Sequence, residues 1–376
     1  MRRLSVNALV CQWRCPRQHS LLARALHSAP FRQLPSSPTA ANAHDRRREP
    51  SSRPSTEPPC LLHTWLSSAP GGKLAPVPYA DAVRFQDDTL RSALLSWKRN
   101  TAEARDPAPV RQTGDDHGIG RRSDSQDDGS TRTGEAAPLP SLLSFVAEPT
   151  YTLGRRQRSL SDAERERLTR LLLQPALDTS GNAAAVSFRP AVVESNRGGL
   201  TTYHGPGQLV LWPVLDLHSP HHRHFTVRDY TRLLEETTQT CLASSYGVST
   251  FLDDDEPGVW HMSTVAEQPG PVKISAVGIH IRRYVTGLGV SVNFDVPVIG
   301  GEDVNPWARF VPCGIEDRGV TSIAAVLGRP RGDELMASRH MGEFAAEWAA
   351  ELSKRLQLNG RVSAGVLEMG SKGSSQ

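Results

Sequence analysis

The chain has 376 residues, enough for one large domain or two smaller ones with a buried core. Its 28 prolines and 30 glycines, together with a hydrophobic share of 38%, favour a globular part diluted by disordered segments. The formal net charge of +3 is too small to indicate a nucleic-acid-binding protein. Its five cysteines lack CxxC spacing, which argues against a disulfide scaffold and favours a reducing compartment.

The first 44 residues contain several arginines and no lysine, aspartate or glutamate. This composition is typical of a mitochondrial transit peptide, and it predicts mitochondrial localisation. The apolar runs are too short and too often broken by arginine for a secretory signal or a membrane span. A basic disordered tail is the alternative. Residues 45–74 are expected to be a disordered linker.

The expected catalytic domain covers residues 75–360, followed by a C-terminal tail at 361–376. Its predicted elements, in chain order, are a helix at 79–97, a strand at 142–146, a helix capped by Ser161 and Glu164, a strand at 192–193, a strand at 209–217, a helix at 226–246, strands at 272–282 and 290–294, and a helix at 341–356. Pro213 should place its strand at an edge or a bulge. Residues 100–137 have almost nothing to bury and predict a disordered insertion. Helices and strands mix without a regular βαβ repeat, so the predicted class is α+β, a mixed sheet with flanking helices.

The segment Arg197–Gln208 combines four glycines, a proline, a cation and an imidazole. Glycine lets another molecule approach the backbone closely, so this segment predicts a ligand cradle. We expect Arg197 and His204, the latter as a hydrogen-bond donor, to position a carbonyl or an anionic ligand. A turn that only reverses the chain is the alternative.

Two further residues could carry chemistry. Lys273 opens an apolar strand, where a lysine is ordinarily a solvated edge charge. Cys313 lies between Pro312 and Gly314, which favour a tight turn that could expose a nucleophile. A lone cysteine is otherwise a small buried hydrophobic residue, but a neighbouring cation would lower its pKa and make it reactive.

Two clusters of polar residues are better interpreted as surface loops than as functional sites. The histidines at 218, 221, 222 and 224 lack a carboxylate or cysteine at ligand spacing, so they predict a surface loop and no metal site. The acidic run Asp253–Glu256 predicts a solvated turn.

The motifs occur in the order of the signature motifs of lipoyl(octanoyl) transferases, and the chain resembles a mitochondrial, fungal-type member of that family over roughly 79–356, without the insertion. The matching segments are the cradle 197–208, the strand 273–278, the turn 312–315 with 320–322, the Tyr-Thr-Leu-Gly-Arg element at 151–156, and Tyr79 with Gln86. The resemblance implies the α+β fold shared with lipoate and biotin protein ligases.

The resemblance also implies the reaction and the site. The family moves an octanoyl group from octanoyl-acyl carrier protein to one lysine of a lipoyl domain, in 2-oxoacid dehydrogenase complexes and the glycine cleavage H protein, through an acyl-cysteine. Cys313 would be the nucleophile, and Lys273 would lower its pKa and shuttle protons. The implied substrate-binding residues are Arg197, Gly198, Gly199, Leu200, Thr201, Thr202, Tyr203, His204, Ala276, Val277, Gly278, Gly289, Val290 and Ser291. No cofactor is implied, since thioester exchange followed by amide formation needs no ATP.

The chain departs from the family at two places. Leu288-Gly289 stands where many members have His-Gly, and residues 294–307 replace the more common segment before the cysteine turn. These differences bear on the acyl pocket more than on the reaction. Two alternatives remain beside the acyltransferase: an ATP-dependent lipoate or biotin ligase of the same fold, and a non-catalytic module that binds lipoyl domains or acyl carrier protein.

Overall fold

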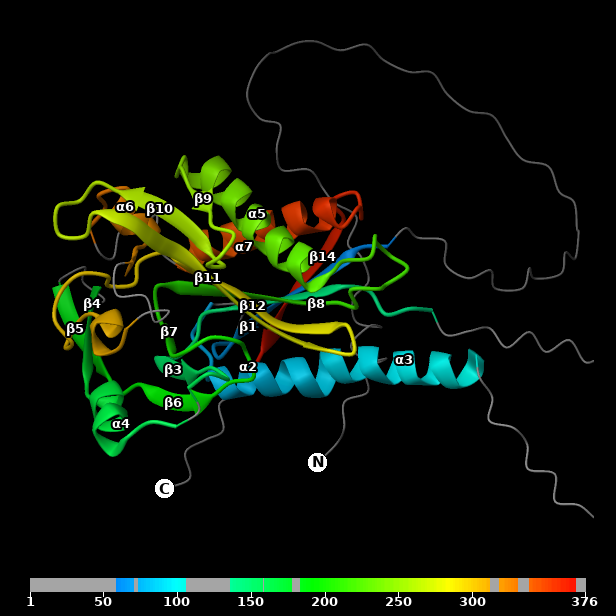
Figure 1. The fold of residues 1–376 in the computed structure, drawn as a ribbon, viewed down its shortest axis with the longest axis horizontal. Coiled ribbons are helices and arrows are strands. Elements are labelled where there is room, and N and C mark those ends of the chain that lie inside the picture. Colours follow the sequence, from blue (N-terminus) through cyan, green and yellow to red (C-terminus); the bar gives the residue numbers. More distant parts are fainter. Residues whose placement is uncertain are drawn as a thin grey trace, which may run out of the picture. The chain divides into compact units, whose positions relative to one another are not determined.

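A mixed β-sheet with helices on both faces lies at the centre of the computed structural model (Figure 1). The structure describes residues 59–70, 74–105, 136–157, 159–177, 183–311, 318–330 and 338–369, all within one compact unit, Pro59–Gln376. The proposed transit peptide, residues 1–44, lies outside these ranges. The predicted α+β class is confirmed.

The main sheet mixes parallel and antiparallel strand pairs. Its strands, in spatial order, are β14 (Val362–Glu368), β1 (Leu61–Ser67), β2 (Ser141–Phe145), β8 (Gln208–Val214), β12 (Val285–Asn293), β11 (Gly270–Arg282), β10 (Val259–Ser263) and β9 (Phe251–Leu252), with β13 (Gly319–Val320) beside β11. Neighbours from β14 to β2 are parallel, and those from β2 to β9 are antiparallel. A smaller sheet contains β6 (Ala191–Glu194), β3 (Thr150–Leu153) and β7 (Thr202–His204), and β4 (Leu172–Leu177) pairs with β5 (Ala183–Phe188).

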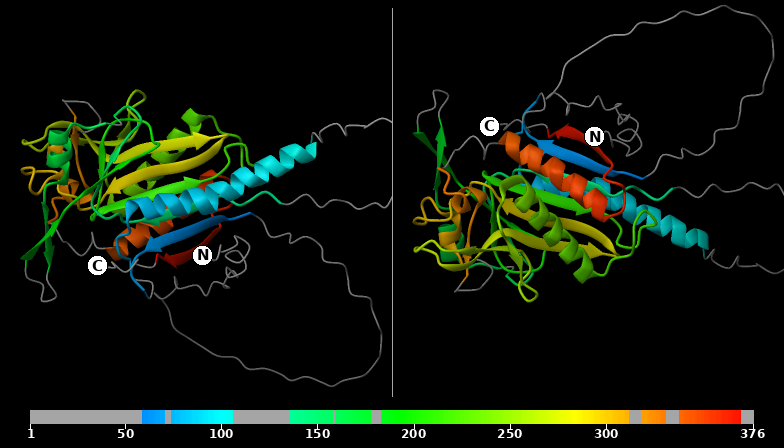
Figure 2. Two further views of the ribbon diagram at one scale, coloured as in Figure 1. Left: turned by 90° about the horizontal axis from the view of Figure 1, so that it is seen from below. Right: turned by 90° about the horizontal axis from the view of Figure 1, so that it is seen from above.

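Two helical layers cover the sheet (Figures 1 and 2). One contains α5 (Val227–Tyr246) and α7 (Ser338–Arg355), and the other contains α2 (Tyr79–Phe85), the π-helix η1 (Gln86–Arg91) and α3 (Ser92–Arg105). The described ranges also contain the helices α4 (Asp162–Thr169), η2 (Pro306–Arg309) and α6 (Ile323–Val326). Leu209 and Leu211 of β8 pack toward α5 and α7, whereas Val210 and Trp212 pack toward α2. This period of two is that of a strand buried on both faces.

The capping signals of two helices are confirmed. Thr226 and Asp229 form a capping box at the start of α5, and Gly247, with φ of 64°, ends the helix in the left-handed conformation. Ser161 and Glu164 form the same arrangement at α4. These signals need only residues a few positions apart, which is why the sequence predicts them well.

The predicted linker and tail are wrong where they fall on strands of the main sheet. Residues 61–67, assigned to the linker, form β1, which pairs with β2 on one side and β14 on the other. The tail contains β14 itself. Leu61 and Leu66 have no exposed surface, so burial of a short apolar run outweighs its proline- and serine-rich surroundings. The predicted insertion at 100–137 begins inside α3, and residues 106–135 lie outside the described ranges.

Pro213 does not lie at an edge, because β8 is a central strand between β2 and β12. The regular pairing of β8 with β12 instead ends at Leu211 and Val290, just before the proline that has no N–H to donate. The Pro213 carbonyl accepts a hydrogen bond of 3.0 Å from Thr286 Oγ1. Leu288 lies opposite this interruption with φ of 59°, and its N–H donates to Gln86 Oε1 at 3.1 Å.

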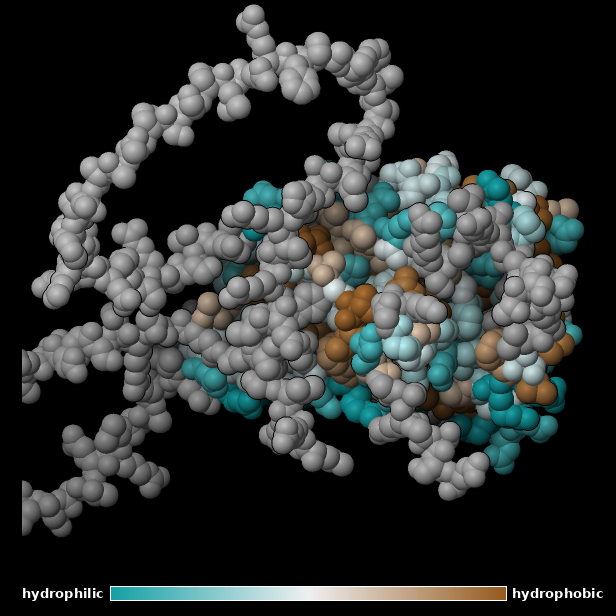
Figure 3. Space-filling model, turned by 180° about the vertical axis from the view of Figure 1, so that it is seen from behind, coloured by the Kyte–Doolittle hydropathy of each residue, from teal (hydrophilic) through white to brown (hydrophobic). Residues whose placement is uncertain are grey.

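The surface mixes polar and apolar areas, and on the back of the molecule apolar side chains gather near the middle of the face (Figure 3). Within the described ranges, no helix has the length and apolar character to cross a membrane.

Cys241 is 1% exposed, as predicted for a core residue, and burial raises the pKa of its thiol.

Candidate active site

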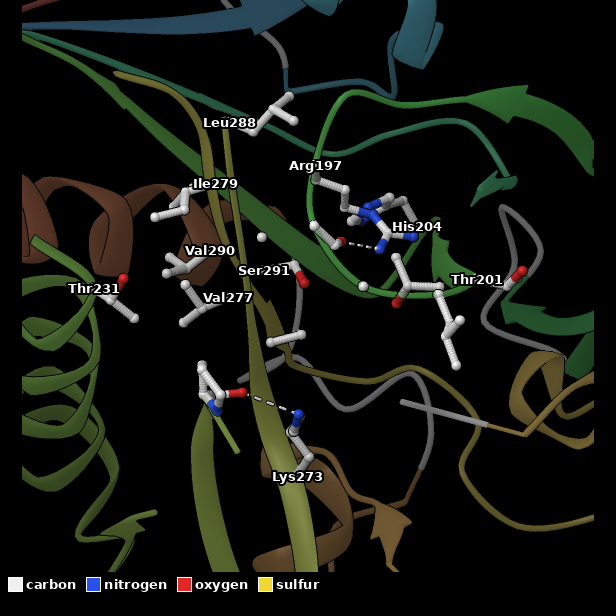
Figure 4. Close-up of a pocket in the computed structure, with 18 of the residues that line it drawn as sticks. Arg197, Thr201, His204, Thr231, Lys273, Val277, Ile279, Leu288, Val290 and Ser291 are labelled. Carbon is white, nitrogen blue, oxygen red and sulfur yellow. Dashed lines mark hydrogen bonds between the residues drawn. The ribbon is translucent and has the colours of Figure 1, made fainter. Parts of the chain in front are cut away.

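A pocket of about 280 Å³ lies between the cradle and strands β11 and β12 (Figure 4). It is lined by most of the residues that the family resemblance implied, namely Arg197, Gly198, Gly199, Leu200, Thr201, Thr202, His204, Lys273, Ala276, Val277, Gly278, Gly289, Val290 and Ser291. These residues come from three segments of the chain. The strand pairing of β11 with β12 sets Ala276 opposite Ser291 and Gly278 opposite Gly289, which brings two of the segments into register.

The pocket has an apolar wall with a cation at one end. In Figure 4, Lys273 and Leu288 lie at opposite ends, and Val277, Val290 and Ile279 lie between them. An apolar wall with few polar groups is typical of a small-molecule site. This arrangement can hold an aliphatic chain with its reactive end near Lys273.

Arg197 builds the cradle through its own guanidinium. Its Nη2 donates to the Thr152 carbonyl at 2.6 Å and to Thr152 Oγ1 at 3.0 Å, and its Nη1 donates to the Gly198 carbonyl at 3.0 Å. Only 8% of Arg197 is exposed. Gly154 of the chain after β3 lets the cradle backbone at Gly199 come close, because a Cβ on Gly154 would lie 2.3 Å from the Gly199 carbonyl oxygen. The arginine therefore ties the cradle to β3 as well as lining the pocket.

A chain of hydrogen bonds decides the tautomer of His204. Asn293 Nδ2 donates to the Thr321 carbonyl at 2.9 Å, so Asn293 Oδ1 faces Gln208 Nε2 at 2.8 Å. Gln208 Oε1 then faces His204 Nδ1 at 2.7 Å, which places the imidazole proton on Nδ1. Burial, with a smaller contribution from Arg197, lowers the pKa of His204 to about 4.

The expectation that His204 donates to the ligand is therefore wrong for the neutral ring. With Nδ1–H directed at Gln208, the remaining nitrogen Nε2 carries a lone pair and can only accept a hydrogen bond. The ring stacks on Tyr79 with centroids 5.1 Å apart, which holds its plane. His204 suits an N–H or O–H group of a ligand, not a carbonyl.

Lys273 is a buried residue and not the solvated edge charge that a strand-end lysine would ordinarily be. It is 6% exposed, its Nζ donates to the Pro257 carbonyl at 3.0 Å, and the ammonium lies 4.5 Å from the centre of the Trp260 ring. Its backbone pairs with Val320 of β13, and its carbonyl accepts from the Thr321 N–H at 3.0 Å. The strand ladder and the indole thus hold the lysine at the end of the pocket.

Tyr203 is not part of the pocket. It has no exposed surface and packs with Tyr151 and Trp307 in a separate cluster. Alternation along β7 explains the difference, because Thr202 and His204 face one side of the strand and Tyr203 the other. The tyrosine instead supports the turn, since its hydroxyl lies 2.1 Å from the position that a Cβ of Gly205 would occupy.

Cys313 lies outside the described residues, so its role stays a prediction. The chain on both sides of it is placed. Phe310 packs edge-on against Tyr151 with ring centroids 5.7 Å apart, and Val320 pairs with Lys273.

The acidic run Asp253–Glu256 is more than a solvated turn, because Asp253 accepts an ion-paired hydrogen bond of 2.6 Å from Arg318. The histidine cluster forms a turn as expected, and His218 stacks on Tyr284 at 4.0 Å.

Several pocket residues were not among the predicted site residues: Tyr79, Arg156, Trp212, Thr231, Glu256, Pro257, Ile279 and Leu288. Ile279 could have been found from the alternation of β11, because it follows Val277 by two positions. Thr231 and Pro257 carry no sequence signal, because their position in the pocket depends on how α5 and its following loop pack on the sheet.

Residues 130–345 match the family model of the lipoyl protein ligase A/B catalytic domain. Because this match covers more than half of the chain, the chain belongs to the class of proteins with a lipoyl protein ligase A/B catalytic domain. A solved structure of P. falciparum LipL1 in complex with lipoate is 8% identical in sequence, with a TM-score of 0.43 and coverage of 83% of this chain and 66% of that one.

Relatives of higher identity define the family more narrowly. An octanoyltransferase of Salinispora tropica is 38% identical over 181 residues, which cover 47% of this chain and 78% of the relative. An octanoyltransferase of Novosphingobium aromaticivorans is 36% identical over 207 residues, covering 53% of this chain and 86% of the relative. The chain belongs to the octanoyltransferase family, whose members are acyltransferases.

Proposed function

We propose that this protein transfers an octanoyl group from octanoyl-acyl carrier protein to a lysine of lipoyl domains, including those of 2-oxoacid dehydrogenase complexes and the glycine cleavage H protein. The observation that carries the proposal is the pocket of an octanoyltransferase-family chain, with an apolar wall that ends at a buried lysine. The apolar wall suits an eight-carbon chain, and in this proposal the thioester reacts at the end of the pocket near Lys273.

The proposed chemistry uses Cys313 as the nucleophile. The Lys273 ammonium stabilises the Cys313 thiolate, whose proton goes to solvent. The thiolate attacks the thioester carbonyl, the C–S bond to phosphopantetheine breaks, and the departing thiolate takes up a proton and leaves as the thiol. In the second step, the amine of the lipoyl-domain lysine attacks the acyl-cysteine, an amide forms, and the Cys313 thiol is restored. Atoms and charge balance without ATP, because one thioester is exchanged for another and then converted to a more stable amide.

His204 and Arg197 have supporting parts in this proposal. The lone pair on His204 Nε2 can accept an amide N–H from the pantetheine arm, and Arg197 keeps the cradle in shape for it. Neither residue needs to gain or lose a proton during the reaction. Binding and orientation of the donor account for both.

Intact-mass analysis after incubation with octanoyl-acyl carrier protein tests the proposal. The wild-type enzyme should gain one octanoyl group without ATP, and Cys313→Ala should gain none. An undiminished adduct on Cys313→Ala would refute the assignment of the nucleophile. Octanoyl attachment to a lipoyl domain that requires ATP would favour a ligase, and binding without any transfer would favour a non-catalytic module.

We also propose that the protein is a fungal-type member that acts in mitochondria. The arginine-rich, acid-free composition of residues 1–44 supports this proposal. Residues 1–44 fused to a fluorescent protein should direct it to mitochondria in a fungal cell. A diffuse signal, with full-length protein still intact, would contradict the localisation.

A further inference from the structure

The turn Glu256-Pro257-Gly258 lies directly behind Lys273. The Pro257 carbonyl accepts the hydrogen bond of 3.0 Å from Lys273 Nζ, and the Glu256 carbonyl accepts a bond of 3.0 Å from Trp260 Nε1. Both the ammonium and the indole beneath it are therefore held by this one turn. The position of the turn therefore contributes to the direction of the lysine.

Glu235 of α5 is hydrogen-bonded to the same turn. Its Oε1 accepts a hydrogen bond of 2.8 Å from the Gly258 N–H, and only 3% of the residue is exposed. Burial raises the pKa of the Glu235 carboxyl, while the Gly258 N–H, Arg232 and Lys273 all favour its ionised form. A carboxylate this deeply buried costs free energy, and its hydrogen bond from Gly258 and its ion pair with Arg232 offset that cost.

The turn packs closely against the lysine at Gly258, where there is no room for a side chain. Its φ is 138°, and a Cβ there would lie 2.8 Å from the Ser275 carbonyl oxygen and 3.0 Å from Lys273 Cε. The backbone of the turn thus touches the lysine stem as well as its ammonium. A shift of the turn would be transmitted to Lys273.

We propose that Glu235 is a positioning residue for Lys273, acting through the Gly258 N–H and the Pro257 carbonyl. This inference rests on the proposed function, in which Lys273 activates the thiol. Other charged groups surround the same place: Arg318 lies 4.9 Å from the Trp260 ring centre and pairs with Asp253, and Arg232 pairs with Asp254. Glu235 is distinguished from them by its direct bond to the turn that holds the lysine.

Steady-state kinetics with octanoyl-acyl carrier protein test the role of Glu235. Glu235→Leu should lower kcat about tenfold, a part of the 10²–10⁴-fold that a positioned acid–base group contributes, and leave KM unchanged. Glu235→Gln keeps an acceptor for the Gly258 N–H and should restore most of kcat. The matched control is Glu236→Leu, which removes the neighbouring carboxylate, bonded to Arg355 at 2.7 Å, and should not change kcat.

A labelling experiment tests the same inference without any acyl transfer. Lys273 should react with an amine-specific reagent several-fold faster in Glu235→Leu than in the wild type, as measured by peptide mass spectrometry. Gly258→Ala should show both effects through a different contact, and it decides the question should Glu235→Leu fail to fold. Wild-type kcat and labelling in a folded Glu235→Leu, or an effect on KM alone, would overturn the inference. If the wild type transfers no octanoyl group, the proposed function fails, and the labelling still reports on the link from Glu235 to Lys273.

Discussion

The side chain of Arg197 lies against the backbone of Gly278, where a Cβ would be 2.9 Å from the arginine Cδ. The two residues belong to the cradle and to β11, so their contact joins two walls of the pocket. Arg197 has no room to yield, because its guanidinium is hydrogen-bonded to Thr152 and Gly198. The absence of a side chain at Gly278 therefore decides the shape of the donor site.

The variant Gly278→Ala should weaken donor binding. The added methyl group would push Arg197 off Thr152 and move the cradle, so KM for octanoyl-acyl carrier protein should rise about tenfold, which corresponds to about 1.4 kcal/mol. Thr152→Val removes the hydroxyl that accepts from Arg197 and should act in the same direction. An unchanged KM in both variants would show that the cradle does not depend on this contact.

Lys273→Met should slow formation of the acyl-enzyme at neutral pH and move the rate profile toward higher pH. Without the ammonium, the thiol would have to ionise unaided, and an unassisted cysteine thiol has a pKa of about 8.5. Single-turnover acylation measured from pH 6 to about 10 checks this expectation. Lys98→Met is the control, because Lys98 pairs with Asp216 and does not line the pocket. A profile that stays the same in Lys273→Met would exclude activation of the thiol.

Leu288→Ala should shift the preferred acyl chain toward greater length. Leu288 stands at the end of the pocket away from Lys273, packed with Tyr79 and Trp212 (Figure 4). Removing its side chain extends the pocket there, so kcat/KM for decanoyl relative to octanoyl donors should rise about tenfold, in line with one or two methylenes in an apolar pocket. Val290→Ala widens the pocket midway and should leave the length preference unchanged. A length profile that shifts equally in both variants would contradict this role of Leu288.

The free energy of unfolding should fall as pH drops from 6.5 toward 4. Burial lowers the pKa of His63 to about 4 from an ordinary value of 6.5, so the unfolded chain binds a proton in this range and the folded protein does not. The loss from His63 alone amounts to about 3 kcal/mol, and His204 acts in the same direction. Chemical denaturation at several pH values should show a smaller loss in His63→Gln. The exposed His224→Gln serves as the control, and an equal loss in all three proteins would refute the assignment.

The sequence predicted the local parts of this fold because their causes are local. The caps of α5 at Thr226 and Gly247 depend on residues within a turn or two, and β11 is marked by a run of apolar residues along the chain. Most of the pocket residues were also predicted, though from their resemblance to a family and not from spacing. Lys273 illustrates the limit, since its sequence position alone favoured a solvated charge.

By itself, the sequence determined the class of fold, the helices and strands with strong periodicity, and the three motifs of the site. Tertiary structure decided that residues 61–67 form an inner strand, that Tyr203 turns away from the pocket, and that His204 is an acceptor. The reason is that these outcomes depend on partners far along the chain. His63 bonds Ser144, 81 residues away, and the tautomer of His204 depends on Asn293, which bonds Gln208 across 85 residues. Only folding brings such groups together, and burial then makes their hydrogen bonds obligatory.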